Sequence, residues 1–269
     1  MPLVETRAGT LAYEERGQGP VLILLHAALH DHHDFDDIVA ALERRYRVIA
    51  VDWPGGGDSP AAVAPAQLSA ALFADGLEDL IDHIGASSVL LIGNSVGGFA
   101  AARLAITRPQ QVAGLVLVDT GGFIPMTRAT RLFCRAMGTP WLARLVLPRF
   151  ARSYMKPQSR LDRQILDRVI ARAKTADGVQ QVAALWRSFA NDDHDLRSRA
   201  AELNAPTLIV WGKRDTAIPL SAGRATHAAL PTSRMVVLNT GHVPFASAPH
   251  EFLREAEPFL KAAAGVRNR

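Results

Sequence analysis

The sequence is poor in cysteine, in lysine and in long apolar runs. A single cysteine, Cys134, cannot build a disulfide framework. The longest apolar runs fall far short of the ~20 residues that a membrane-spanning helix needs, so we expect no stable membrane association. Residues 1–5 are already acidic and strand-like, and they lack the basic stretch followed by an apolar stretch that marks a secretion signal. We therefore expect a cytoplasmic protein.

Arginine carries nearly all of the positive charge: 26 arginines accompany 4 lysines, and the formal net charge is +4. No segment resembles the basic recognition helix or the aromatic strip of nucleic-acid-binding modules, so we predict no nucleic-acid partner. The charge is uneven along the chain. Residues 123–199 contain fifteen Lys and Arg against six Asp and Glu, a net charge of +9, whereas the remainder carries −5. The middle of the chain therefore differs in composition from the rest.

Apolar residues are plentiful, at 48% of 269 residues. A chain of this length buries roughly three quarters of its unfolded surface, so it can hold a core and a cleft without metal ions or cross-links. Short apolar runs without alternation are typical of strands buried on both faces of a parallel sheet. Together with a hairpin at the start and helical stretches between the runs, they predict an α/β fold with a mostly parallel eight-stranded sheet flanked by helices. The predicted strands are 3–7, 11–15, 21–25, 46–51, 89–92, 114–118, 207–211 and 235–238.

The alternation of strands and helices breaks at Gly121-Gly122 and resumes at residue 204. Between these points we predict only helices, at 130–152, 159–175 and 179–191. This helical insertion follows the carboxyl end of a strand, where ligand sites form in α/β sheets. We therefore predict a core built from residues 1–122 and 204–269, with residues 123–203 as an inserted helical cap.

The sharpest motif is Gly93-Asn94-Ser95-Val96-Gly97, which lies between an apolar run and a helical segment. A Gly-x-Ser-x-Gly turn of this kind strains the serine backbone, and its glycines are needed where strand and helix come too close for a side chain. The serine then lies at the amino end of the helix, whose dipole favours developing negative charge. The motif predicts that Ser95 is a nucleophile.

A serine hydroxyl needs a base to take its proton, and the base needs an acid to orient it. Two downstream loops, each following an apolar run, offer Asp215 and His242. The order serine, acid, histidine is that of the nucleophile elbow. Asp119, which ends an earlier strand, is the alternative acid. We favour Asp215, because its surroundings are the fuller match to this order.

These motifs resemble the α/β-hydrolase fold family, in particular serine hydrolases with a helical cap. The resemblance covers nearly the whole chain and includes residues 52–59 and the His26-Ala27-Ala28 loop. It implies that the backbone N–H groups of Ala28 and Val96 bind the oxyanion. Ala27 stands where the family usually has glycine, and a positive φ there would cost alanine on the order of 1 kcal/mol. We expect no cofactor.

Several other polar residues could suggest further chemistry. Residues 30–34, His-Asp-His-His-Asp, suggest a metal site, but adjacent side chains point in different directions, so we predict a solvated loop near the entrance and no metal. We interpret His194 as a polar linker that closes the cap, and His26 as a structural hydrogen-bonding residue. Cys134 lies in an apolar stretch without a paired base, which favours packing over nucleophilic chemistry.

A serine nucleophile points to attack on a carbonyl and to an acyl-enzyme that water hydrolyses. Esters, lactones and thioesters all fit this description. One alternative is the hydrolysis of carbon–carbon bonds in diketone acids, although the resembling enzymes have Trp directly after the histidine, where this chain has Val243. A second is a ligand receptor that keeps the triad without turnover.

The predicted cap is rich in apolar side chains that could surround a small-molecule substrate. We expect Phe123, Met126, Trp141, Trp186 and Val243 to contact it. The arginine excess permits either attraction of an acidic substrate or a solvated outer face. The sequence is compatible with a monomer or a homodimer.

Overall fold

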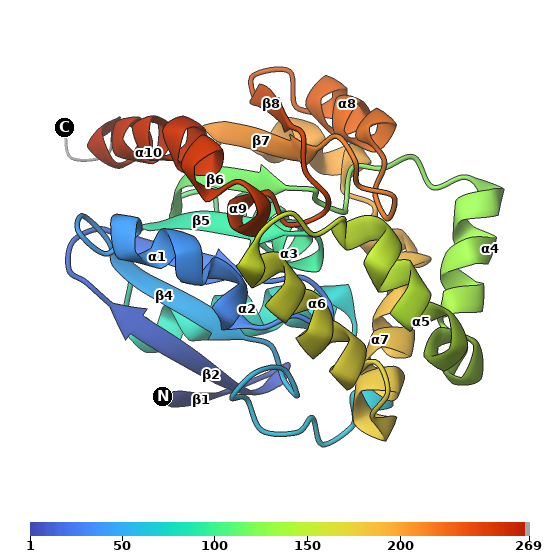
Figure 1. Cartoon of the computed structure of the whole chain (residues 1–269). Helices are drawn as coiled ribbons and strands as arrows, with labels where there is room; N and C mark the ends of the chain where they lie inside the picture. The colour runs from blue at the N-terminus through green and yellow to red at the C-terminus, as the bar shows by residue number, and fades with distance from the viewer. Residues whose placement is uncertain (267–269) are drawn as a thin grey trace.

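The computed structural model describes residues 1–266 and contains one eight-stranded sheet in the order β1-β2-β4-β3-β5-β6-β7-β8 (Figure 1). β2 pairs antiparallel with β1 and with β4, and all the other neighbours are parallel. The mostly parallel α/β sheet that the sequence predicts is confirmed. The strands are β1 (Leu3–Thr6), β2 (Gly9–Arg16), β3 (Val21–Leu25), β4 (Arg47–Asp52), β5 (Val89–Asn94), β6 (Val112–Val118), β7 (Thr207–Gly212) and β8 (Arg234–Leu238).

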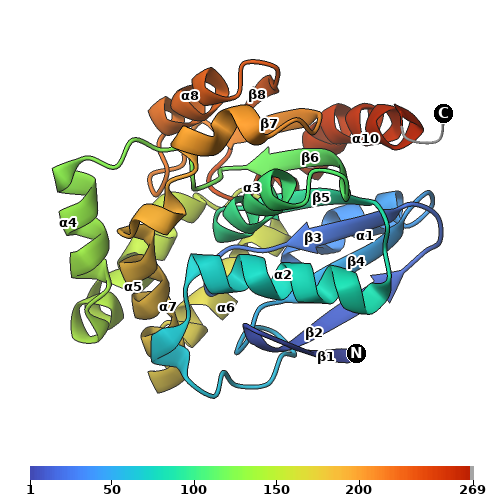
Figure 2. The same ribbon diagram turned by 180° about the vertical axis from the view of Figure 1, so that it is seen from behind.

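The central strands carry apolar residues on both faces because helices cover both sides of the sheet. Every residue of β5, β6 and β7 is buried. One face is covered by α2 (Ala70–Ile84), α3 (Val96–Thr107) and α8 (Leu220–Ala229), and the other by α1 (Asp36–Leu42), α9 (Pro244–Ser247) and α10 (Pro249–Val266) (Figures 1 and 2). No described helix is both long and apolar enough to cross a bilayer.

Four further helices lie between β6 and β7 in the chain. They are α4 (Arg128–Met137), α5 (Pro140–Met155), α6 (Arg160–Arg172) and α7 (Ala176–Phe189), followed by two short 3-10 turns, η3 (Asp192–His194) and η4 (Arg197–Glu202). In both views these helices gather at one end of the sheet, beside the carboxyl ends of the parallel strands (Figures 1 and 2). The fold therefore places the insertion next to the loops that carry Ser95, Asp215 and His242.

Candidate active site

Ser95 occupies the tight turn between β5 and α3, with φ 56° and ψ −115°. Such a conformation costs a non-glycine residue about 1–3 kcal/mol, so the surrounding structure must hold it. A Cβ atom at Gly93 would lie 2.5 Å from the carbonyl oxygen of Gly97, and one at Gly97 would lie 2.4 Å from the carbonyl oxygen of Leu25. The glycines are thus required by close backbone contacts, as the sequence indicated.

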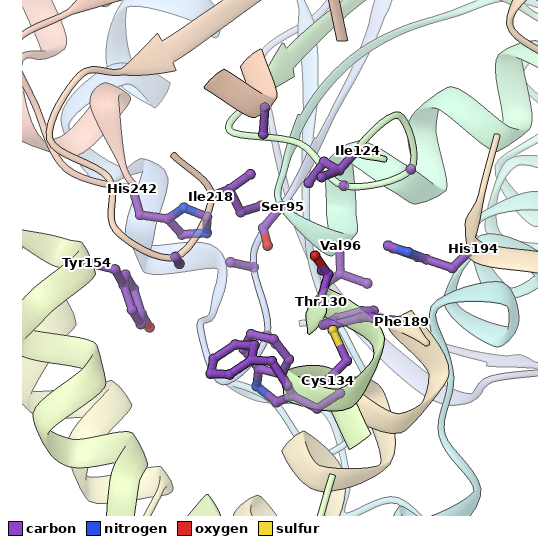
Figure 3. Close-up of a pocket in the computed structure, with 18 of the residues that line it drawn as sticks. Ser95, Val96, Ile124, Thr130, Cys134, Tyr154, Phe189, His194, Ile218 and His242 are labelled. Carbon is purple, nitrogen blue, oxygen red and sulfur yellow. The ribbon is translucent and has the colours of Figure 1, made fainter. Parts of the chain in front are cut away.

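Asp215 and His242 form a buried hydrogen-bonded pair. The His242 Nδ1 atom lies 2.6 Å from Asp215 Oδ2, and each residue is 4% exposed. Asp215 Oδ1 accepts hydrogen bonds from the backbone N–H groups of Ala217 and Ile218, at 2.7 and 3.2 Å, which fix the carboxylate. With the proton on Nδ1, Nε2 is left as the basic nitrogen. Figure 3 shows the His242 ring turned toward Ser95 across the pocket that both residues line.

Asp119 lies behind this pair and is fully buried. Its two carboxyl oxygens accept from the backbone N–H of Gly212, at 2.9 and 3.2 Å. Burial, followed by the neighbouring Asp215 carboxylate, raises the pKa of Asp119 well above its ordinary value. Asp215 is the carboxyl group that contacts His242, whereas Asp119 accepts from the Gly212 N–H.

The three side chains Asp119, Asp215 and His242 could in principle offer atoms to a metal ion, since one such atom from each lies within 4.8 Å of the others. The 2.6 Å separation of Nδ1 and Oδ2 is that of a direct hydrogen bond. An ion between these two atoms would push them apart, because each ligand lies about 2 Å from the metal. The geometry favours a shared proton.

The loop that follows β3 borders the pocket beside Ser95 through Ala27, Ala28 and Leu29. In this loop the residue with a positive φ is Leu29, at 67°, and not Ala27. The alanine at position 27, where the family usually has glycine, therefore causes no backbone strain. Val96, whose N–H is one of the free donors at the start of α3, lines the same pocket.

His26 holds the loop after β3 in place through two hydrogen bonds. Its Nε2 accepts from the backbone N–H of Trp53 at 3.1 Å, so Nδ1 carries the proton and donates to the carbonyl of Ala27 at 2.7 Å. Burial lowers the pKa of His26, which keeps the ring neutral. The structural role that the sequence suggested for His26 agrees with these contacts.

A cavity of about 450 Å³ opens above Ser95 between the sheet edge and the insertion. Its wall is largely apolar and includes Ile124, Met126, Phe133, Leu147, Phe150 and Trp186. Among the described residues no Lys or Arg lines it. The arginines of the insertion therefore do not form the wall of this cavity, and the reading in which they contact an acidic substrate there is not supported.

Five insertion or loop residues were expected to contact substrate, and only Met126 and Trp186 line the cavity. Phe123 is fully buried in the core cluster that packs on α3, so it lies behind the wall. Trp141 lies at the start of α5 and is 69% exposed. Val243 is fully buried with Phe245 on the other face of the sheet. The prediction that the side chains of Phe123, Trp141 and Val243 face the substrate is wrong, because none of the three lines the cavity.

The prediction of a solvated loop at residues 30–34 is also wrong. His30, Asp31, His32 and Asp34 are each at most 4% exposed. The cause is contact with an arginine that lies far away in the sequence. Nε of Arg168 on α6 lies 3.0 Å from Asp31, and its Nη2 lies 3.3 Å from Asp34.

His32 is held separately from these ion pairs, since its Nδ1 lies 2.8 Å from a carboxylate oxygen of Asp52. His30, whose Nδ1 contacts Asp34, lies 3.3 Å through Nε2 from the hydroxyl of Tyr154. The cluster therefore pairs internally and with the insertion instead of converging on one ion.

Sequence reasoning missed several polar residues of the pocket wall, among them Tyr154 and His194. The Tyr154 ring packs edge-on to His242 at 5.2 Å, and its carbonyl accepts from the His242 backbone N–H at 3.1 Å. His194 is buried and faces the cavity, whereas the sequence suggested a polar residue in a linker. No local pattern in the sequence marks either residue, because both reach the cavity through tertiary packing. Cys134 also lines the wall, and burial raises the pKa of its thiol to about 11.

Comparison with known proteins agrees with this architecture. The sequence profile of the α/β hydrolase fold matches residues 20–249. The chain is 32% identical over 252 residues to 2-hydroxy-6-oxononadienedioate/2-hydroxy-6-oxononatrienedioate hydrolase 2 of Pseudomonas putida. The aligned region covers 86% of this chain and 85% of that protein.

Solved structures share the fold. A thermophilic esterase from Thermogutta terrifontis superposes with a TM-score of 0.82 at 23% identity, over 98% of this chain and all of that one. An enol-lactonase from Burkholderia xenovorans LB400 superposes with a TM-score of 0.77 at 23% identity, over 97% and 100% of the two chains. With its eight-stranded sheet, its serine turn and the profile match over most of its length, the chain belongs to the α/β-hydrolase fold family.

Proposed function

We propose that the protein is a serine hydrolase that cleaves a carboxylic ester or lactone of a small, largely apolar substrate. The observation that carries this proposal is His242, held by the buried Asp215, on the wall of the same largely apolar cavity as Ser95. In this proposal residues 123–203 form the cap that encloses the substrate, and no cofactor takes part.

In the proposed reaction, His242 Nε2 takes the proton of the Ser95 hydroxyl while Oγ attacks the substrate carbonyl carbon. The carbonyl oxygen becomes an oxyanion, to which the N–H groups of Ala28 and Val96 donate; each such donor is worth about 3–4 kcal/mol where measured. The imidazolium then protonates the leaving alcohol as the carbon–oxygen bond breaks. Water, deprotonated by His242, attacks the acyl-enzyme and returns the serine hydroxyl.

The cavity supports a neutral acyl substrate. Its volume of about 450 Å³ falls within the range of small-molecule sites. Transferring an ionised carboxylate to an apolar wall is costly unless a cation pairs with it, and the described wall residues include no Lys or Arg. A substrate with an uncharged acyl chain matches this surface.

A second candidate is carbon–carbon bond hydrolysis of a diketone acid, which the name and the 32% identity of the Pseudomonas putida relative favour. That substrate name denotes a dicarboxylate. No Lys or Arg is among the described residues of the wall, which disfavours such an anion, as does Val243 in the position after the histidine. We therefore place ester or lactone hydrolysis first.

Steady hydrolysis of p-nitrophenyl butyrate tests the proposal. The wild type should turn over many equivalents, and Ser95→Ala or His242→Ala should each remove nearly all activity, with the double variant little worse because triad members act as a unit. Additive losses would contradict a shared mechanism. Release of at most about one equivalent of nitrophenol would instead indicate a receptor that acylates without turnover.

A further inference from the structure

His194 is held rigidly on the wall of the cavity. It ends the turn η3, and its ring lies between Phe99 of α3 and Phe189 of α7, at centroid distances of 4.6 and 4.9 Å. A Cβ atom on Gly121 would lie 3.0 Å from His194 Nε2, so the absence of a side chain there lets the ring sit against the backbone. Figure 3 shows the ring projecting into the cavity from the side opposite His242.

His194 is 8% exposed and lines the cavity, and no hydrogen bond or ion pair to its ring nitrogens is found among residues 1–266. The adjacent carboxylate, Asp195, is instead paired with Arg197 at 2.6 Å. Burial lowers the pKa of His194 to about 4, so at neutral pH the ring is uncharged and offers one N–H donor and one acceptor nitrogen.

We propose that His194 recognises a second, uncharged oxygen of the substrate, a ketone or hydroxyl on the acyl chain, and thereby determines specificity. This inference rests on the proposed function and narrows its substrate class to oxygenated neutral acyl esters or lactones. A charged substituent is disfavoured, because the ring carries no charge and the described wall carries no cation.

The size of the expected preference follows from the cost of an unmade buried hydrogen bond. A ligand without the second oxygen leaves the imidazole dry and unpaired, whereas a ligand with it completes the bond. Such differences change binding by roughly ten- to a hundredfold. An aliphatic chain of the same length should therefore bind more weakly than its oxygenated counterpart, although it is more apolar.

Binding to the full-length Ser95→Ala protein tests recognition without turnover. The probes are methyl hexanoate and its three analogues with a ketone oxygen on the third, fourth or fifth carbon, titrated by NMR. We expect at least one ketone ester to bind about tenfold more tightly than methyl hexanoate. The same ester should lose this preference in Ser95→Ala/His194→Phe, because phenylalanine can stack between the two rings but cannot form the hydrogen bond.

Two further variants secure the interpretation. His194→Gln keeps a donor and an acceptor and should retain part of the preference, even if the phenylalanine variant folds poorly. His250→Phe, at an exposed position at the start of α10, is the matched control and should leave the preference unchanged. Equal binding of all four esters to the Ser95→Ala protein would overturn the inference, and so would a preference that persists in both His194 variants.

These outcomes are distinguishable from failure of the proposed function. Binding to the serine-free protein needs no nucleophile, so a ketone preference without ester turnover in the wild type would contradict only the hydrolase proposal. Turnover of p-nitrophenyl butyrate together with equal binding of the four methyl esters would contradict only the role of His194.

Discussion

Two buried carboxyl groups meet at the base of the site, and they differ in their hydrogen-bond partners. Asp215 accepts hydrogen bonds from two backbone N–H groups and from His242. Asp119 accepts from the Gly212 N–H and is fully buried, and burial, followed by the neighbouring Asp215 carboxylate, raises its pKa well above the ordinary value. At the residue scale, therefore, Asp215 is the carboxyl group that holds the ring of His242 in place.

Replacing each carboxyl by an amide should separate the two roles. Asp215→Asn should lower kcat by roughly 10³–10⁴-fold, because an amide cannot hold the imidazole in the required tautomer. Asp119→Asn should stay within about tenfold of wild type, since asparagine tolerates the local φ of 41° and its oxygen can still accept from Gly212. Steady-state kinetics decide the matter: equal losses in the two variants would contradict the assignment.

His194 also predicts how stability depends on pH. Its pKa in the folded protein, about 4, is below the ordinary value of 6.5, so the unfolded chain binds more protons between these values. The free energy of unfolding must then fall as the pH falls through this window. Between pH 7.5 and 5, wild type should lose about 2 kcal/mol more than His194→Phe. Urea unfolding at both pH values checks this, and parallel losses in the two proteins would show that His194 does not titrate in this way.

At the scale of elements, α6 connects the insertion to the loop of Ala27, Ala28 and Leu29, which borders the pocket beside Ser95. The Arg172 guanidinium donates to the carbonyl of Leu29 at 2.9 Å and also to that of His30. Arg168 on the same helix pairs with Asp31 and Asp34. These contacts position a strained loop, in which Leu29 has a positive φ.

Removing this connection should affect both stability and catalysis. Arg172→Ala should lower the free energy of unfolding by about 2 kcal/mol and reduce kcat several-fold, because the carbonyls lose charge-assisted donors and the loop gains freedom. Arg163→Ala, an exposed position on the same helix, is the control and should change stability by about 0.5 kcal/mol or less. Thermal melts and kinetics of both variants measure this. A loss in Arg163→Ala as large as that in Arg172→Ala would remove the special role of Arg172.

The elements that the sequence predicts well are those with a local signal. Strands appear as continuous apolar runs, and Ser95, Asp215 and His242 each follow such a run, so their meeting at one sheet edge could be expected. The run before His242 differs in burial, because β8 is an edge strand of which only Leu238 is buried. The helices of the insertion are different. Their periodicity marks an apolar face but not the neighbour that covers it, which is why Trp141 proved exposed and Phe123 proved to lie in the core.

The polar cluster at residues 30–34 shows a second limit. Its burial depends on Arg168, which lies 137 residues beyond Asp31 in the chain. A run of histidines and aspartates has the same local appearance whether water or distant arginines surround it. The same applies to His194, whose two aromatic neighbours come from α3 and α7.

At the scale of the whole molecule, several arginines of residues 123–199 hold the insertion to its neighbours through hydrogen bonds and ion pairs. Arg131, Arg168, Arg172 and Arg187 bind carboxylates or backbone carbonyls, and none of them lines the cavity. Exposed charges are screened over about 8 Å at physiological ionic strength, so any steering by the outer surface should weaken with salt.

This arrangement predicts little selection by charge at the cavity. The ratio of kcat/KM for a neutral ester to that for its carboxylate-bearing isostere should favour the neutral ester and change less than about twofold between low and high salt. Assays of the two esters over a range of salt concentrations provide the measurement. A preference for the carboxylate ester that disappears with salt would restore the role of arginines as attractants.

The central claim is a covalent acyl-enzyme on Ser95, and rapid-quench mass spectrometry with p-nitrophenyl butyrate tests it most directly. The account predicts a burst of about one nitrophenol per chain, a butyryl group on the peptide that contains Ser95, and continued turnover afterwards. Ser95→Ala should show neither the burst nor the adduct. A butyryl group on another residue, or a Ser95→Ala protein that hydrolyses the ester as fast as wild type, would contradict it.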